Sequence, residues 1–201
     1  MQRSPARIGV LAVQGDFEAH GRALEALACE AVEVRRPEQL EVLEGLVISG
    51  GESTTIMKGL DSYGLAEPLR SFASSGRPIL GTCAGLIVLD RGHLGVMDIE
   101  ARRNAFGRQV RSFEADLSIS GLGDEPLRAV FIRAPWIEHW GEEVDVLATI
   151  DGHAVVGRER NVLVAAFHPE LTDDLRLHAL FLSLGRTAHP AAGSLGWERT
   201  Q

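Results

Sequence analysis

The chain has 201 residues, a length typical of one domain whose core needs no disulfide bridges. Hydrophobic residues make up 45% and charged residues 24%, while the formal net charge of −8 argues against nucleic-acid binding, because an acidic surface repels phosphates. Two cysteines are too few for a disulfide framework, and no apolar stretch approaches the length of a membrane span. We therefore expect a cytoplasmic protein that binds neither nucleic acid nor membranes.

The first part of the chain alternates apolar runs with helical stripes. Near-continuous apolar runs are typical of strands buried on both faces of a parallel sheet, and apolar residues at helical spacing follow or precede them. This alternation predicts βαβ units. The expected strands are 8–14, 31–35, 45–49 and 78–82, and the expected helices are 17–27, 65–73 and 86–89.

The pattern changes after about residue 92. Residues 110–119 alternate polar and apolar side chains, as in a strand with one solvated face. We find no repeat and no second domain boundary. The sequence predicts one three-layer α/β/α domain over residues 1–186, with a mixed, mainly parallel sheet, and a flexible tail over 187–201. Further strands are expected at 129–133, 144–150, 154–157 and 162–167, and a closing helix at 175–184.

The strongest local motif is Gly81-Thr-Cys83-Ala-Gly85, between a buried strand and a helix. Its spacing matches the strand–elbow–helix turn of G-x-S-x-G hydrolases, with cysteine in place of serine. Side chains at the flanking glycines would collide with backbone, and a helix N-terminus favours thiolate. Most cysteines without disulfides are small buried hydrophobes, but this frame favours Cys83 as a nucleophile. Cys29 lies in a helical stripe without such glycines, so we interpret it as a small buried hydrophobic residue.

A thiolate needs a base, and the base needs an orienting group. His168 and Glu170 follow an apolar strand and stand two residues apart, so in an extended chain both side chains leave the same face. A carboxylate beside one imidazole nitrogen leaves the other free to exchange a proton with sulfur. Neither an HExxH nor a CxxC motif occurs, and we expect no metal and no organic cofactor.

Two adjacent glycines, Gly50 and Gly51, follow another parallel strand, at the sheet edge where such folds bind ligands. No phosphate-binding G-x-x-x-x-G-K-[ST] motif occurs here. The glycines can instead aim a backbone N–H at a developing oxyanion, so the N–H groups of Gly51 and Ala84 are expected to form an oxyanion hole. Arginine can hold a substrate carboxylate, but spacing alone assigns no arginine to that role.

Together these motifs resemble those of the class I glutamine amidotransferases, and more closely the branch that serves as the glutaminase subunit of pyridoxal 5′-phosphate synthase. The elbow and His168-Pro-Glu170 are shared across the class, whereas residues 103–109 and 131–135 are selective for the branch. The resemblance implies a flavodoxin-like fold. The other matching stretches are 9–15, 36–40, 50–55, 81–87, 112–116 and 168–171, which leave out little beyond the two ends.

The resemblance implies hydrolysis of L-glutamine to L-glutamate and ammonia. The ammonia would pass to a separate synthase (lyase) subunit, which builds pyridoxal 5′-phosphate within a large hetero-oligomer. On the matching positions Cys83 would be the nucleophile, with His168 and Glu170 as its relay. The glutamine site would be lined by Gly51, Glu52, Ser53, Arg103, Ile132 and Arg133.

The chain departs from the family pattern at a few places. Ser49 stands where proline is usual, the link 90–92 is short, and Trp136 and Trp140 follow the 131–135 motif where smaller residues are expected. Alternative functions are a glutaminase of another pathway, a γ-glutamyl hydrolase with the same triad, or a catalytically silent binding module. The selective motifs argue against the first two, and the intact Cys, His and Glu set argues against the third.

Overall fold

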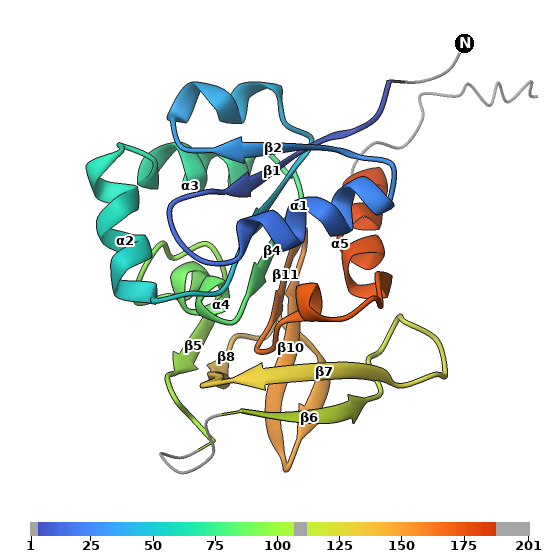
Figure 1. The fold of residues 1–201 in the computed structure, drawn as a ribbon. Coiled ribbons are helices and arrows are strands. Elements are labelled where there is room, and N and C mark those ends of the chain that lie inside the picture. Colours follow the sequence, from blue (N-terminus) through green and yellow to red (C-terminus); the bar gives the residue numbers. More distant parts are fainter. Residues whose placement is uncertain (1–3, 107–111, 188–201) are drawn as a thin grey trace, which may run out of the picture.

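A nine-stranded sheet forms the centre of the protein in a computed structural model that describes residues 4–106 and 112–187 (Figure 1). Five neighbouring strands are parallel and stand in the order β2–β1–β3–β4–β11. This is the strand order of flavodoxin-like folds, which bind ligands where the order reverses beside the first strand. These strands are β1 (Arg7–Leu11), β2 (Glu30–Val34), β3 (Gly45–Ile48), β4 (Ile79–Thr82) and β11 (Val162–Ala165).

Antiparallel strands extend the sheet beyond β11. The order continues from β10 to β8 and β5, and β9 pairs with β10 as well. A separate antiparallel ribbon of β6 and β7 lies beside this part of the sheet (Figure 1). The predicted mixed sheet with a parallel core is thus confirmed. The bounds are β5 (Ile99–Arg102), β6 (Ser112–Leu117), β7 (Leu127–Ile132), β8 (Trp136–Trp140), β9 (Asp145–Ile150) and β10 (His153–Glu159).

Helices cover both faces of the parallel strands (Figure 1). Helices α1 (Phe17–Ala26) and α5 (Arg176–Thr187) lie on one face. The other face carries α2 (Ser53–Ser62), α3 (Ala66–Ser74) and α4 (Ala84–Leu89). Two short 3-10 helices, η1 (Pro37–Val42) and η2 (Pro169–Leu171), complete the described elements.

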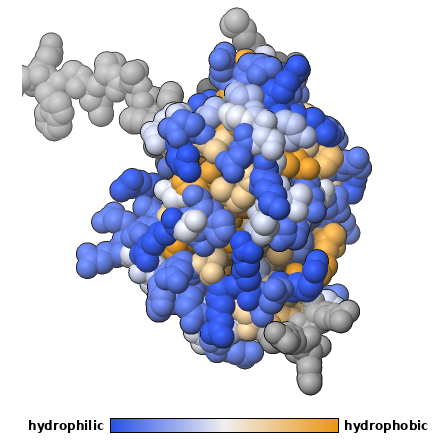
Figure 2. Space-filling view, turned by 90° about the vertical axis from the view of Figure 1, so that its left-hand side faces the viewer, coloured by the Kyte–Doolittle hydropathy of each residue, from blue (hydrophilic) through white to orange (hydrophobic). Residues whose placement is uncertain are grey.

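Burial explains the apolar runs of the sequence. Every residue of β3, β4 and β11 is buried, because helices exclude water from both faces of these strands. On the face shown in Figure 2, hydrophilic residues predominate and apolar residues form small patches broken up by them. No helix among the described residues is long and apolar enough to cross a membrane.

Several elements differ from the prediction. The first strand ends at Leu11 rather than at residue 14, because the following residues form the loop that meets β3. Helix α2 was not expected, since its polar start resembles a loop, but Glu52 caps it and Ile56 and Leu60 pack into the core. Strands β5 and β8 were also missed. Residues 107–109 of the selective motif and the predicted tail from 188 onward lie outside the described residues.

Candidate active site

Cys83 lies in a strained turn between β4 and α4, as the glycine spacing predicts. Its φ of 48° and ψ of −105° are unusual for a residue with a side chain. A Cβ on Gly85 would lie 2.0 Å from the carbonyl oxygen of Ile48, and one on Gly81 would lie 2.9 Å from that of Gly85. The N–H of Cys83 donates to Ala165 in β11 at 2.8 Å. Backbone packing therefore fixes the position of the sulfur.

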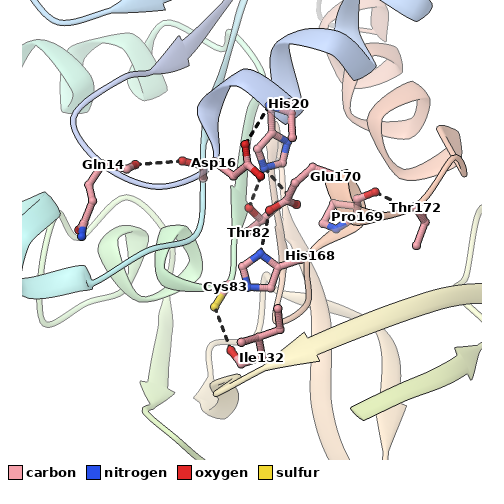
Figure 3. Close-up of polar contacts among 12 residues, drawn as sticks. Gln14, Asp16, His20, Thr82, Cys83, Ile132, His168, Pro169, Glu170 and Thr172 are labelled. Carbon is pink, nitrogen blue, oxygen red and sulfur yellow. Dashed lines mark hydrogen bonds and ion pairs between the residues drawn. The ribbon is translucent and has the colours of Figure 1, made fainter. Parts of the chain in front are cut away.

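His168 and Glu170 lie beside Cys83, directly after β11 (Figure 3). Nδ1 of His168 is 2.7 Å from Oε1 of Glu170, and the backbone N–H of His168 donates to Val130 in β7. The expected extended geometry is wrong, because Pro169 begins η2 immediately after His168. A turn, rather than strand alternation, brings the two side chains together.

The electrostatics of these residues favour an ion pair. Burial lowers the pKa of His168, but hydrogen bonding and charge from Cys83 and Glu170 outweigh it and raise the pKa to about 10. Burial raises the pKa of Glu170, whereas the hydrogen bond from His168 and the nearby His20 bring it below its usual value. At neutral pH His168 is thus an imidazolium beside the ionised carboxylate of Glu170.

The double glycine after β3 lies against this pair. A Cβ on Gly50 would lie 2.5 Å from Cε1 of His168 and 3.3 Å from Cβ of Cys83, so only glycine fits there. Gly51 has a φ of 139°, a conformation that residues with side chains rarely adopt. The sequence analysis singled out both glycines but assigned a site role to Gly51 alone, and the contact of Gly50 with His168 and Cys83 is visible only in the structure.

Most of the predicted glutamine-binding residues lie at the surface next to the buried pair. We call Glu52, Arg103, Ile132 and Arg133, all exposed, the recognition rim. The carboxylate of Glu52 caps α2 by accepting from the N–H groups of Thr54 and Thr55, and these hydrogen bonds lower its pKa. Its own N–H donates to Oε1 of Gln14, at the point where the strand order reverses. Among the other candidates, Gly51 is exposed and Ser53 is buried at the start of α2.

The two halves of the recognition rim are joined through the backbone. Ala105 donates an N–H to the carbonyl of Ala134 at 3.0 Å, which ties the Arg103 segment to the Arg133 segment. Arg133 has a φ of 45°, a strained conformation for a side chain of this size. The carbonyl of Ile132 faces Cys83, whose Sγ lies 3.9 Å from its oxygen. The rim therefore reaches the sulfur of Cys83 through the backbone of Ile132.

Sequence reasoning missed His93, which contacts Arg103, and Asp90, which contacts His93. The short link contains Asp90, a buried residue whose Oδ1 lies 2.7 Å from Nδ1 of His93. Nε2 of the same histidine lies 3.0 Å from one guanidinium nitrogen of Arg103, and the other terminal nitrogen donates to Oγ1 of Thr54 at 3.3 Å. The imidazole bridges a carboxylate and an arginine, which the sequence could not show because the contacts depend on how the link folds.

The two unexpected tryptophans have different environments. Trp136 is buried in β8, and its ring stacks on His153 with centroids 3.5 Å apart. Trp140 lies at the end of β8 and is 47% exposed. The first is therefore part of the packing of the antiparallel strands, and the second lies at the surface.

The structure thus places a buried thiol, an imidazole and a buried carboxylate together on a flavodoxin-like sheet, and these are the groups that thiol-dependent acyl-transfer enzymes use. The SNO glutamine amidotransferase family model matches residues 10–185, and the chain belongs to this family.

Relatives are similar along nearly their whole length. The chain is 53% identical to the pyridoxal 5′-phosphate synthase subunit PdxT of Geobacillus kaustophilus (strain HTA426), over 92% of this chain and 98% of that protein. It is 52% identical to the same subunit of Carboxydothermus hydrogenoformans (strain ATCC BAA-161 / DSM 6008 / Z-2901), over 88% and 96%.

Two solved structures share the fold of this chain. A crystal structure of a glutamine amidotransferase superposes with a TM-score of 0.84 at 47% identity, covering 89% of this chain and 98% of that one. The structure of PurLQS from Thermotoga maritima shares the fold, with a TM-score of 0.68 at 17% identity, covering 93% of this chain and 100% of that one.

Proposed function

We propose that this chain is the glutaminase subunit of a pyridoxal 5′-phosphate synthase in the cytoplasm. It hydrolyses L-glutamine to L-glutamate and ammonia, and it supplies the ammonia to a synthase subunit. The observation that carries the proposal is the contact of a strained, buried Cys83 with an imidazole that is itself bonded to a buried carboxylate. The similarity to subunits named for pyridoxal 5′-phosphate synthase supports the pathway.

The reaction is a two-step acyl transfer at Cys83. The thiolate attacks the side-chain carbonyl carbon of glutamine, and N–H groups of Ala84 and Gly51 stabilise the oxyanion. When the intermediate collapses the carbon–nitrogen bond breaks, and the imidazolium of His168 protonates the departing nitrogen to give ammonia. Neutral His168 then takes a proton from water, whose oxygen attacks the thioester carbon. The carbon–sulfur bond breaks, which releases glutamate and restores the thiolate of Cys83 beside the imidazolium. Glu170 keeps the imidazole oriented throughout, so the cycle uses this chain's own residues.

The recognition rim has a separate task. Glutamine carries an α-carboxylate, and in an acidic protein it needs a local cation. Arg133 follows Ile132, whose carbonyl faces Cys83, and the segment of Arg103 is bonded to the same stretch through Ala105 and Ala134, so these two arginines are the candidate cations. Glu52 contributes through its backbone, since its carboxylate caps α2, and Ser53 lies beside it.

We further propose that docking of the synthase subunit, within a large hetero-oligomer, switches hydrolysis on. The Gly50-Gly51 turn packs against Cys83 and His168, and glycine lets a peptide rotate at little steric cost. Rotation would carry the Gly51 N–H into or out of the oxyanion hole.

Ammonia release by the chain, with and without its synthase subunit, tests both parts of the proposal. Weak activity alone and strong activity in the complex is the expected result. Gly51→Val should block this rise without preventing association of the subunits. Full activity of the isolated chain contradicts the switch but not the glutaminase assignment. No glutamine hydrolysis in the complex contradicts the assignment itself.

A further inference from the structure

Two histidines outside the reaction steps lie behind Glu170, on the side away from Cys83. His20 comes from α1 and His178 from α5, and both are 0% exposed. Nδ1 of His20 lies 3.0 Å from Nε2 of His178. Figure 3 shows the ring of His20 next to Glu170 and Thr82. Burying an imidazole costs free energy unless its nitrogens form hydrogen bonds. The tautomers of His20 and His178 must therefore match the donors and acceptors around them.

The charged groups around the two rings leave both neutral. Burial lowers the pKa of His20, opposed by the charges of Glu170 and Asp16 and reinforced by His168. Burial lowers the pKa of His178 to about 3; the charge of His20 lowers it further, and that of Glu170 opposes the change. Each ring therefore carries one N–H at neutral pH, and its location is decided by the neighbours.

Glu170 selects the tautomers. Nε2 of His20 lies 3.2 Å from Oε2 of Glu170 and 3.2 Å from Oγ1 of Thr82. A nitrogen lone pair would be repelled by the carboxylate, so the hydrogen of His20 is on Nε2. Its Nδ1 is then an acceptor, which receives the Nε2–H of His178. The Nδ1 of His178 has no hydrogen-bond partner among the described residues, and this order leaves it an unprotonated acceptor instead of a buried unpaired N–H.

Oε2 of Glu170 depends on this contact. Oε1 is bonded to His168, whereas Oε2 is buried without a well-aligned hydrogen bond from any described residue. Nε2 of His20, which also contacts Thr82, lies 3.2 Å from this oxygen and can donate its hydrogen to it. We propose that His20, oriented by His178, is a positioning residue that keeps Glu170 ionised and thereby maintains the ion pair of His168 and Cys83. This inference rests on the proposed function of the three residues.

Removal of the donor has a predictable direction. Without the N–H of His20 the carboxylate is less stabilised, and the proton shared with His168 moves toward Glu170. A neutral imidazole no longer stabilises a thiolate, so the thiolate of Cys83 forms only at higher pH. The effect falls on the chemical step, because His20 lies on the far side of Glu170 from the sulfur.

The test compares His20→Leu, which removes the donor, with His20→Gln, whose amide nitrogen can occupy the place of Nε2. Leu24→Val, a buried change on the same helix, controls for loss of packing. Two assays are carried out. The first gives kcat and KM for glutamine in the complex with the synthase subunit. The second gives the pH dependence of Cys83 alkylation by iodoacetamide in the isolated chain, followed by mass spectrometry of the Cys83 peptide.

We expect His20→Leu to lower kcat about tenfold, to leave KM within about twofold, and to move the alkylation midpoint up by roughly one pH unit, the shift that corresponds to a tenfold change. His20→Gln should restore most of both, and Leu24→Val should lower only the melting temperature. An alkylation midpoint in His20→Leu equal to that of the wild type contradicts the proposal, as does one equally shifted in Leu24→Val.

If His20→Leu fails to fold, His20→Gln and His20→Asn decide the matter, since asparagine places its amide nitrogen near Nδ1 and cannot reach Glu170. Equal midpoints and equal kcat values for these two variants contradict the proposal. Alkylation needs neither glutamine nor the synthase subunit. A wild-type complex without glutaminase activity therefore contradicts the proposed function, while the midpoints still report on His20.

Discussion

The protein holds two groups of residues in different ways: the buried relay of Cys83, His168 and Glu170, and the exposed recognition rim. The side chains of Glu170 and His168 are 1% and 14% exposed, and the backbone of Cys83 is bonded to β11. The rim is exposed, and Arg103 is held by side-chain contacts with His93 and Thr54. In the proposed mechanism the reacting groups are therefore held by the packing of the sheet, whereas glutamine recognition depends on a few surface contacts. Changes in the first should affect kcat or folding, and changes in the second should affect KM.

The largest effect is expected at the nucleophile. Cys83→Ala should lower glutamine hydrolysis by at least about 10⁴-fold, because no thioester can form, while the melting temperature changes little. Cys29→Ala is the matched control and should keep most of the activity; Cys29 lies between α1 and β2 rather than in the helix that the sequence predicts. The measurement is ammonia release in the complex. Substantial activity in Cys83→Ala would remove the residue from the mechanism.

Gly85→Ala tests whether packing holds the elbow. The added Cβ would lie 2.0 Å from the backbone oxygen of Ile48, so β3 or α4 must move. We expect a loss of about 3 kcal/mol in the free energy of unfolding, at the upper end of overpacking effects, and loss of activity. Gly21→Ala in α1, where the nearest atom is 3.8 Å away, should instead stabilise by about 0.5–1 kcal/mol. Denaturant unfolding measures both, and equal stabilities would contradict a packed elbow.

Arg103→Ala tests the recognition rim. A charge-assisted hydrogen bond is worth about 1.5–3 kcal/mol, so KM for glutamine should rise roughly tenfold to a hundredfold with little change in kcat. Arg158→Ala, which breaks the exposed pair with Asp145 in the antiparallel strands, is the control and should leave KM within about twofold. Identical kinetics for the two variants would exclude Arg103 from the glutamine site.

A smaller effect is expected at His93, which contacts Arg103 of the recognition rim. His93→Ala removes the imidazole that bridges Asp90 and Arg103, so the guanidinium keeps its contact with Thr54 but loses the one with His93. We expect KM to rise about threefold with kcat unchanged, since a net hydrogen bond contributes about 0.5–1.5 kcal/mol. His139→Ala, an exposed histidine in β8, should have no effect. A fall in kcat at constant KM would show that His93 acts on the chemistry instead.

The sequence predicts the relay better than its surroundings, for a physical reason. Apolar runs predict buried strands, and the glycines around Cys83 indicate a turn whose backbone leaves no room for side chains. Both features can therefore be predicted from a short stretch of sequence. The contact of His20 with His178 joins residues 158 positions apart, and neither position carries a local signal. Helix α2 was missed because its capping residue, Glu52, lies outside the usual Asp, Asn, Ser and Thr set.

The central claim is that one thiolate, Cys83, forms the covalent intermediate with glutamine. The most direct measurement is mass spectrometry of the complex after treatment with a glutamine analogue that carries a diazo ketone in place of the carboxamide. We predict a single adduct on the Cys83 peptide, prevented by excess glutamine and formed in step with the loss of ammonia release. An adduct on another residue, or hydrolysis that persists after complete labelling of Cys83, would contradict the account.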